Sequence, residues 1–352
     1  TDDERLEDDG PPDLLPARTD RAQHGRAVRV VAQVGQAALE HRGRFLAVQH
    51  AGDAAEVPGG KLADRVIRML TGDFLQRTEL FFHVKARGIA VVENIVSQHA
   101  QDPNLADGQA CCHEGEISGR LGLPGWPGVA EEVIVARDVM LARHTGSRVH
   151  VAHASTAGTV EVLRWAKSLG IAVTAEATPH HLMLPTDLVE SYDPVYKVNP
   201  PLRPSEDIEA VREALADGTI DIVATDHAPH ARHDKEHAFP DAAFGMLGLE
   251  TAFAVVHDVM VDSGRIDLAT LAERMSHAPA RIAGLTDHGR AIEAGAPAHL
   301  VLVDPTDRIT VDPATSHSLS RNTPFAGHTL TGRVRTTILR GRVTAADGEV
   351  NL

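Results

Sequence analysis

Acidic and imidazole side chains follow the apolar run of residues 220–223 at the point where that run stops. The run is rich in β-branched residues, which are typical of a buried strand, and Pro229 prevents a helix from forming directly after it. We therefore expect Asp226, His227 and His230 in a loop at the carboxyl end of a strand. In β/α proteins this edge of the sheet carries the chemistry. The alternative is a capped strand end, because Asp and His are common loop residues that satisfy backbone groups.

Two further histidines are placed in the same way. His99 follows the strand-like residues 89–95, and His153 ends the short apolar stretch 148–153. Imidazole and carboxylate groups are zinc ligands, and a catalytic zinc site uses three protein groups and leaves one position for water. Zinc lowers the pKa of that water toward ~7, which supplies hydroxide at neutral pH. His99, His153 and Asp226 therefore predict a hydrolytic metal site, although a single histidine at a strand end is more often structural.

Composition limits the classes of protein. The 352 residues are 43% hydrophobic, which is enough for one large α/β domain with an appendage. The net charge of -15 argues against a surface for nucleic acid or for anionic membranes. We recognise no membrane-spanning run and no signal peptide, and the two cysteines are adjacent. We therefore expect a cytoplasmic protein without a disulfide framework.

Strand and helix patterns alternate through the middle of the chain. Apolar spacing predicts helices over residues 129–144 and 159–169, and a third helix that starts at Ser205 and ends before Gly218. Strand-like residues separate these helices, and polar residues occur only at the strand ends. This alternation predicts a parallel β/α barrel or sheet. The apolar residues at helical spacing in the first helix are Val129, Val133, Ala136 and Met140.

The two ends of the chain differ from this middle part. Residues 61–82 have a weak helical pattern, and the first 96 residues contain no recognisable site motif. From residue 296 onward, short β-rich pieces are separated by Asp-Pro and Asp-Gly turns, which predicts a small β appendage. We therefore divide the chain into an atypical or truncated N-terminal region (1–96), the C-terminal part of a barrel (97–295) and part of a small β-sandwich (296–352).

Ordered motifs from about residue 98 to the C-terminus resemble a bacterial class I dihydroorotase of the cyclic amidohydrolase superfamily. These motifs are Gln98-His-Ala100, His113-Glu-Gly115, His153-Ala-Ser-Thr-Ala-Gly-Thr159, Glu176-Ala-Thr-Pro-His-His181, Val198-Asn-Pro-Pro-Leu-Arg203, Ala224-Thr-Asp-His-Ala-Pro-His230, Phe244-Gly-Met-Leu-Gly-Leu-Glu250, Pro279-Ala-Arg-Ile282 and Asn322-Thr-Pro-Phe325. The resemblance implies a metal-dependent-hydrolase (β/α)8 barrel of the TIM type with a small β-sandwich appendage. It also implies reversible hydrolysis of L-dihydroorotate to N-carbamoyl-L-aspartate in pyrimidine biosynthesis.

The resemblance implies a role for each matching residue. His99 and His153 would hold one of two zinc ions. Asp226 would ligate the other ion and transfer a proton, as a base toward the attacking hydroxide and as an acid toward the leaving amide nitrogen. The residues that would contact the dihydropyrimidine ring and its carboxylate are Asn199, His230 and Gly245 with its neighbouring backbone.

The first 96 residues depart from the family pattern. The family carries a His-x-His-Leu-Arg motif, a following asparagine and a metal-bridging carboxylate there, and none of these is present. About four βα units of ~30 residues each do not fit ahead of His99. We therefore expect a barrel that is incomplete in its N-terminal half, and an appendage without partner strands from residues 1–50. With three protein ligands, we expect at most one zinc ion per chain and dihydroorotase activity near background.

Two alternatives stay open. One is a hydantoinase- or allantoinase-like cyclic amidase, although the motif Asn199-Pro-Pro-Leu-Arg203 favours dihydroorotase. The other is a catalytically inactive, dihydroorotase-like barrel that serves as a structural partner of aspartate transcarbamoylase. An incomplete barrel would expose strand edges and core surface, which invites pairing with a second chain and makes a homo-oligomer a further expectation.

Overall fold

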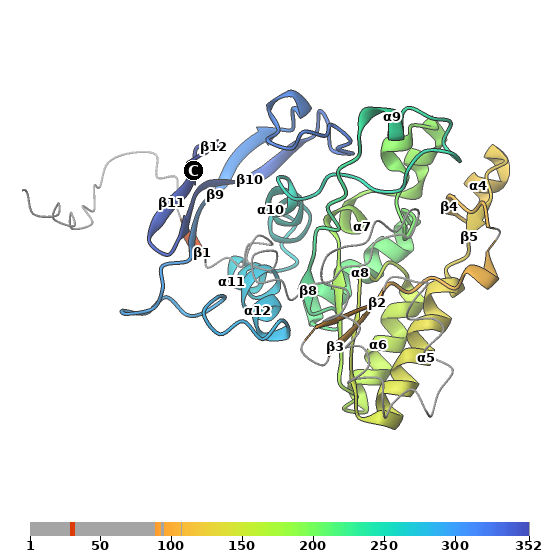
Figure 1. The fold of residues 1–352 in the computed structure, drawn as a ribbon, viewed down its shortest axis with the longest axis horizontal. Helices are drawn as coiled ribbons and strands as arrows, with labels where there is room; N and C mark the ends of the chain where they lie inside the picture. Colours follow the sequence, from red (N-terminus) through yellow and green to blue (C-terminus); the bar gives the residue numbers. More distant parts are fainter. Residues whose placement is uncertain (1–28, 32–88, 93–94, 107, 352) are drawn as a thin grey trace, which may run out of the picture.

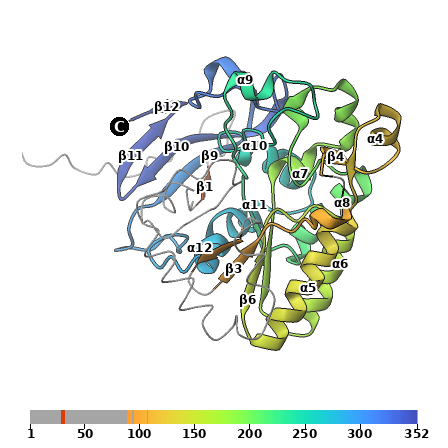
Figure 2. The same cartoon turned by 45° about the vertical axis from the view of Figure 1, so that its right-hand side comes forward.

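The computed structural model of the chain describes residues 29–31, 89–92, 95–106 and 108–351 (Figure 1). The helix predicted over residues 61–82 lies outside the described residues, as does most of the N-terminal region. Two sheets organise the described part: a mostly parallel sheet packed against helices, and an antiparallel sheet formed largely by the C-terminal residues (Figures 1 and 2).

The first sheet has the strand order β2-β3-β6-β7-β8. Its strands are β2 (Ile89–Val92), β3 (Ile95–Gln98), β6 (Arg148–Val151), β7 (Val173–Ala177) and β8 (Ile222–Val223). The last four are parallel neighbours, whereas β2 runs antiparallel to β3. The single strand predicted over residues 89–95 is therefore wrong, because the segment forms two strands and only the second belongs to the parallel set.

Three helices pack along the parallel sheet: α5 (Val129–Thr145), α6 (Ala157–Ser168) and α8 (Ser205–Asp217). α6 packs between α5 and α8. These helices confirm the three predicted from apolar spacing, within about two residues at each end. α5 and α8 end at Gly146 and Gly218, whose φ angles of 72° and 89° suit a residue without a Cβ. Thr156 begins α6 by accepting a hydrogen bond from the Thr159 amide with its hydroxyl.

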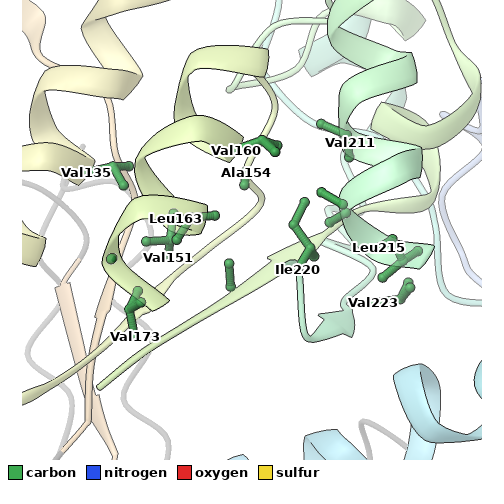
Figure 3. Packing of buried hydrophobic residues seen from close by; sticks show 14 of the residues in the cluster. Val135, Val151, Ala154, Val160, Leu163, Val173, Val211, Leu215, Ile220 and Val223 are labelled. Carbon is green, nitrogen blue, oxygen red and sulfur yellow. The ribbon is translucent and has the colours of Figure 1, made fainter. Parts of the chain in front are cut away.

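The core lies between these helices and the sheet (Figure 3). Val151 and Val173 come from the strands, and Leu163, Val211 and Leu215 come from the helices; each is at most 5% exposed. Burying one such side chain contributes about 1.5–3 kcal/mol. This packing holds the carboxyl ends of β6, β7 and β8 side by side at one edge of the sheet.

The buried face of α5 differs from the predicted one. Val129, Val133 and Met140 are 46%, 37% and 58% exposed. The residues that face the core are Ala130, Glu131, Ile134, Val135, Val139 and Ala142. The face was misassigned because a buried charge, Glu131, lies within the apolar stripe and breaks its apparent period.

The antiparallel sheet has the strand order β1-β9-β10-β11-β12. Its strands are β1 (Arg29–Val31), β9 (Leu300–Thr310), β10 (Thr329–Leu339), β11 (Arg342–Ala346) and β12 (Glu349–Val350). The predicted β appendage is thus present. The expectation that residues 1–50 supply no partner strand is wrong, because β1 pairs with β9 and places Val31 opposite Val301. Three residues are too few to produce a recognisable alternating pattern, so only the pairing reveals this strand.

Shorter segments connect and cover the two sheets. They are η1 (Pro103–Leu105), β4 (Cys112–His113), α4 (Glu116–Leu121), β5 (Gly125–Trp126), α7 (Pro179–Met183), η2 (Thr186–Ser191), η3 (Pro194–Tyr196), α9 (Arg232–Lys235), α10 (Ala252–Val256), η4 (His257–Asp262), α11 (Leu268–Ala272), η5 (Glu273–His277), α12 (Ala278–Ile282) and η6 (Pro313–Thr315). α10 packs against β10 and so joins the helical layer to the antiparallel sheet. Among the described helices, none is both long enough and apolar enough to cross a membrane.

Candidate functional site

His99 and His153 lie in direct contact at the ends of adjacent strands. His99 follows β3, His153 follows β6, and the two strands are parallel neighbours. The distance from His99 Nδ1 to His153 Nε2 is 2.8 Å, and the rings meet edge to face at 78°. His153 is only 7% exposed and has a left-handed φ of 36°. The structure therefore brings together two of the three predicted metal ligands.

The contact between the two rings leaves part of His153 unsatisfied. Its Nε2 meets His99, but its Nδ1 is buried and has no hydrogen-bond partner among the described residues. Two imidazole nitrogens bound to one tetrahedral zinc lie about 3.4 Å apart, given bonds of ~2.0–2.1 Å. A small opening of the 2.8 Å contact would reach that spacing. The pair thus fits a shared zinc ion.

Asp226 follows β8 and is partly buried, with a left-handed φ of 46°. Burial raises the pKa of Asp226 above its ordinary value; the charge of His153 acts in the opposite direction and that of Glu176 reinforces the rise. In the part of the chain that the structure describes, one trio of side chains has possible ligand atoms all within 4.8 Å of one another, and Asp226 is not in it. β7 lies between β6 and β8, so the backbone at the ends of β6 and β8 is about two strand spacings of ~4.8 Å apart, and the His153 charge still acts on Asp226 across β7.

Glu176, on the intervening strand β7, supports the position of His153. Its carboxylate accepts hydrogen bonds from His150 Nε2 at 3.0 Å and from the His153 amide at 3.3 Å. Burial alone would raise the pKa of Glu176, but the hydrogen bond and charge of His150 outweigh it and the pKa is lowered. An ionised carboxylate therefore holds the backbone of His153 in its left-handed conformation. The sequence signal was a charged residue in an otherwise apolar strand, and we assigned it no role.

A second buried polar cluster lies next to His153 in the chain. The Glu131 carboxylate accepts hydrogen bonds from the amide of Ser155 at 2.8 Å and from its hydroxyl. Arg203 lies 3.4 Å from the same carboxylate and donates to Ser155 Oγ at 3.0 Å and to His113 Nδ1 at 3.0 Å. Burial and the neighbouring Arg203 charge lower the pKa of His113 to about 4, so its ring is a neutral acceptor. Sequence reasoning missed this cluster.

His230 and Gly245 face each other in the loops beyond β8. His230 Nε2 donates to the carbonyl of Phe244 at 2.7 Å, which fixes the proton of the neutral ring on Nε2. The Gly245 amide donates to the Lys197 carbonyl at 2.9 Å, and the Gly245 carbonyl accepts from Lys235 Nζ at 3.0 Å. Gly245 has a φ of 123°, and a Cβ there would lie 2.9 Å from His230 Nε2. Gly245 therefore offers space beside His230, while its own polar groups are used within the protein.

Asn199 is, with His230 and Gly245, one of the three predicted substrate-binding residues. Its side-chain Oδ1 is buried and has no hydrogen-bond partner in the described part of the chain. The following bond, Asn199-Pro200, is cis. An acceptor left open in this way can take an N–H group of a bound molecule.

A cavity of about 490 Å³ lies between the barrel loops and the antiparallel sheet. Its lining includes His227, Glu250, Arg308, His317 and Arg333. None of the predicted site residues lines it, and only His227 connects it to the loop that carries Asp226. The cavity is thus separate from the histidine pair.

Comparisons with known proteins agree with the dihydroorotase resemblance. The chain matches the amidohydrolase family over residues 128–344 and a dihydro-orotase-like family over residues 72–159. It is 59% identical over 262 residues to a dihydroorotase of Streptomyces coelicolor, covering 74% of this chain and 61% of that protein. It is 54% identical over 265 residues to a dihydroorotase of Mycobacterium tuberculosis, covering 75% of this chain and 61% of that protein. The chain thus spans about three fifths of the length of these relatives.

Solved structures of related enzymes share the fold. An L-hydantoinase (dihydropyrimidinase) from Arthrobacter aurescens superimposes with a TM-score of 0.68 at 27% identity, covering 87% of this chain and 64% of that one. A D-hydantoinase (dihydropyrimidinase) from Thermus sp. gives a TM-score of 0.63 at 26% identity, covering 73% and 58%. The parallel sheet with its helices is the corresponding part of a TIM-type barrel, accompanied by a separate antiparallel sheet. Since the family match spans well over half of its residues, the chain belongs to the amidohydrolase family.

Proposed function

We propose that this chain is a dihydroorotase-type cyclic amidohydrolase, in which interconversion of L-dihydroorotate and N-carbamoyl-L-aspartate is impaired by the missing His-x-His motif. The observation that carries the proposal is the contact between His99 and His153 at the ends of β3 and β6. The sequence around them is the part that matches dihydroorotases of Streptomyces coelicolor and Mycobacterium tuberculosis. Retention of this pair favours a metal-dependent site over a barrel that has lost its chemistry.

The histidine pair would hold one zinc ion. Zinc bound there would supply a water of lowered pKa as the attacking group. His153 would bind the ion through a ring nitrogen, with its backbone amide bonded to Glu176. Two imidazoles are in contact at this edge, and no trio of described residues that includes Asp226 has its ligand atoms all within 4.8 Å, so we propose at most one ion here.

Asp226 would transfer the proton between the attacking water and the leaving amide nitrogen. A general acid or base works best when its pKa lies near the operating pH. Burial raises the pKa of Asp226 toward that range, the charge of His153 opposes the rise, and the charge of Glu176 adds to it. Asp226 is therefore better suited than an exposed aspartate to hold a proton for part of the cycle.

Asn199, His230 and the space beside Gly245 would bind the substrate. The open Oδ1 of Asn199 can accept an N–H of the dihydropyrimidine ring. His230 already uses Nε2 to bond Phe244, so Nδ1 is the nitrogen available to a ligand, as an acceptor when neutral and as a donor to a carboxylate when protonated. The absence of a Cβ at Gly245 keeps the ring of His230 accessible.

A second candidate function is hydrolysis of hydantoins or related cyclic amides. The observation that favours it is the similarity to the L-hydantoinase from Arthrobacter aurescens, with a TM-score of 0.68. The sequence identity to that enzyme is 27%, against 59% to the dihydroorotase of Streptomyces coelicolor. Dihydroorotate is therefore the substrate that we propose first.

The test is zinc analysis and turnover of the purified full chain. We expect His153→Ala to remove no more than one zinc ion per chain, because the pair formed by His99 and His153 would bind at most one ion. We expect hydrolysis of dihydroorotate near background, because the His-x-His-Leu-Arg motif is absent. Loss of even one well-placed electrostatic contact typically costs ~10²–10³-fold in rate. Hydantoin and allantoin serve as competing substrates. Loss of two zinc ions on His153→Ala, with rapid turnover of the unchanged protein, would show that further ligands lie outside the described residues.

The partner proposals have a separate test. We propose that this chain pairs with a second copy or with aspartate transcarbamoylase, because β2 and β8 end the parallel sheet among the described residues and an unpaired strand edge invites pairing with another chain. Size-exclusion chromatography with light scattering, with and without that enzyme, distinguishes the two. A chain that stays monomeric in both experiments rules out both partners.

A further inference from the structure

We propose that Asp287, His288 and His299 form a second zinc site, located where the last barrel helix meets the antiparallel sheet. Each of the three offers one possible ligand atom, and these atoms all lie within 4.8 Å of one another. None of the three belongs to the histidine pair at the barrel edge or to the loops around Asp226. The proposal therefore stands independently of the dihydroorotase activity.

The first two residues are anchored to the barrel. They follow α12, and the next residue, Gly289, accepts a hydrogen bond from His277 Nδ1 at 2.7 Å through its carbonyl. Gly289 has a φ of 59°, and a Cβ there would lie 2.6 Å from the Cβ of Ala280 in α12. The segment that carries Asp287 and His288 is thus packed tightly against the helix end.

The third residue is anchored to the antiparallel sheet. His299 directly precedes β9, and the neighbouring Ala298 carbonyl accepts a hydrogen bond from the Gly341 amide at 3.0 Å, in the turn between β10 and β11. The three side chains therefore meet across residues 290–298, which connect the barrel to the sheet. A cation bound by all three would tie the two parts together.

His299 supplies the second, independent observation. It is only 7% exposed, and its Nε2 is buried without a hydrogen-bond partner in the described part of the chain. Its ring is stacked on that of His288, with centroids 4.3 Å apart and planes 10° from parallel. An unmade hydrogen bond at a buried group costs about 1–3 kcal/mol. A ligand between these side chains would remove that cost.

The donor set fits zinc. Two imidazoles and a carboxylate are ligands that zinc takes, with one position left for water. His288 Nδ1 lies 3.0 Å from Asp287 Oδ1, and because a carboxylate can only accept, the proton sits on Nδ1 and leaves Nε2 free to bind a metal.

Ligation requires a local adjustment at His299. Its Nδ1 accepts a hydrogen bond from the Arg340 amide at 3.3 Å, which keeps the ring proton on Nε2. Binding through Nε2 moves that proton to Nδ1 and breaks this contact, which is longer than a strong hydrogen bond. The stacked rings also have to open toward the ion. These are side-chain rotations, and they leave the backbone anchors in place.

The experiment measures zinc binding by the full-length, tag-free chain after treatment with a chelator. Zinc chloride is titrated calorimetrically, and cobalt(II) is used in parallel because its visible absorption reports tetrahedral coordination. His153→Ala serves as the background, so that the barrel-edge pair does not contribute. We expect this background to bind one zinc ion per chain and His153→Ala/His288→Gln to bind none. In the same background, Asp287→Asn should bind at least about 10–100-fold more weakly, because it removes a charged ligand that also orients His288.

The control is His233→Gln, which changes a histidine whose side chain is 85% exposed. It should leave zinc binding unchanged. Equal zinc binding with and without His288→Gln overturns the proposal, as does a loss of binding on His233→Gln, which would indicate surface histidines. If the His288→Gln protein fails to fold by circular dichroism, the cobalt spectrum of the His153→Ala background decides. A tetrahedral spectrum supports the site, and absence of binding overturns it.

Discussion

Two buried polar clusters of the barrel lie two residues apart in the chain and use their hydrogen-bonding groups differently. Around Ser155, the carboxylate of Glu131 and the guanidinium of Arg203 bond to each other and to their neighbours, and both side chains are 1% exposed. At His153, one ring nitrogen has no partner among the described residues, and the Asn199 side-chain oxygen, in the segment before Pro200, has none either.

The difference indicates what each cluster is for. A buried polar group without a hydrogen bond costs free energy, whereas a satisfied one does not. The left-handed φ angle at His153 adds strain to the His153 cluster, and Asp226 also has a left-handed φ angle; such angles are the kind of feature that persists at functional sites. We infer that the Glu131–Arg203 cluster holds the helices on the sheet, and that the His153 cluster gives up stability to keep groups open for a ligand.

The largest effect should come from breaking the satisfied cluster. Arg203→Met leaves the Glu131 carboxylate buried without its charged partner, and we expect a loss of about 3–5 kcal/mol in the free energy of unfolding. Urea denaturation measures it. The matched control is Arg120→Met, because Arg120 pairs with Glu190 at the surface, where both side chains are about half exposed. The control should cost no more than about 1 kcal/mol. Equal losses in the two variants would contradict our view of the cluster.

A smaller effect should come from pH. His181 is buried and bonds Thr178 Oγ1 and the Pro200 carbonyl, and burial, reinforced by the charges of His153 and Arg203, lowers its pKa to about 3. Below the pKa of ~6.5 that His181 has in the unfolded chain, the unfolded chain binds a proton at His181 that the folded protein does not bind. Stability is therefore full above ~6.5 and falls as the pH drops, by about 2 kcal/mol from pH 7 to pH 5 for this group.

The variant His181→Gln isolates that contribution. Glutamine does not titrate, so the unfolding free energy of this variant should depend less steeply on pH between 7 and 5. His233→Gln, at an exposed position, is the control and should keep the original slope. An unchanged slope in His181→Gln would mean that other groups cause the acid sensitivity.

Local sequence signals predicted the elements that position the site. The helices end at Gly146 and Gly218, and the strands end at polar residues. Parallel neighbouring strands end at one edge of a sheet, so the contact between His99 and His153 could be predicted without coordinates. Whether Asp226 joins this pair depends on how far its loop reaches across β7, which local sequence signals do not predict.

Interactions between segments that are distant in the chain could not be predicted from the sequence. Glu131 and Arg203 are 72 positions apart, and each alone reads as an exposed charge. That misreading also assigned the wrong face to α5. His288 and His299 lie on either side of an aperiodic connection, where spacing carries no information about proximity. β1 is too short to have a pattern of its own and is defined by its pairing with β9.

The smallest change in stability should come from replacing Asp226. Asp221, before the same strand β8, provides the comparison. Asp221 and Asp226 flank β8. The Asp221 carboxylate accepts hydrogen bonds from Lys167 Nζ and from the Ala175 amide, each at 2.8 Å, so Asp221→Asn should cost about 1–3 kcal/mol. For Asp226, burial raises the folded pKa, with His153 opposing and Glu176 adding to the rise. Its contribution is therefore favourable at low pH and is lost as the pH rises past its unfolded value.

At neutral pH the charge of Asp226 opposes folding, and asparagine removes it while tolerating the left-handed φ of 46°. We expect Asp226→Asn to leave the unfolding free energy unchanged within about 0.5 kcal/mol or to increase it, measured by urea denaturation at pH 7. The same variant should lose any residual dihydroorotate turnover, because it cannot transfer a proton. A loss of stability as large as that of Asp221→Asn would mean that Asp226 is a structural residue, and the two ends of β8 would then be alike.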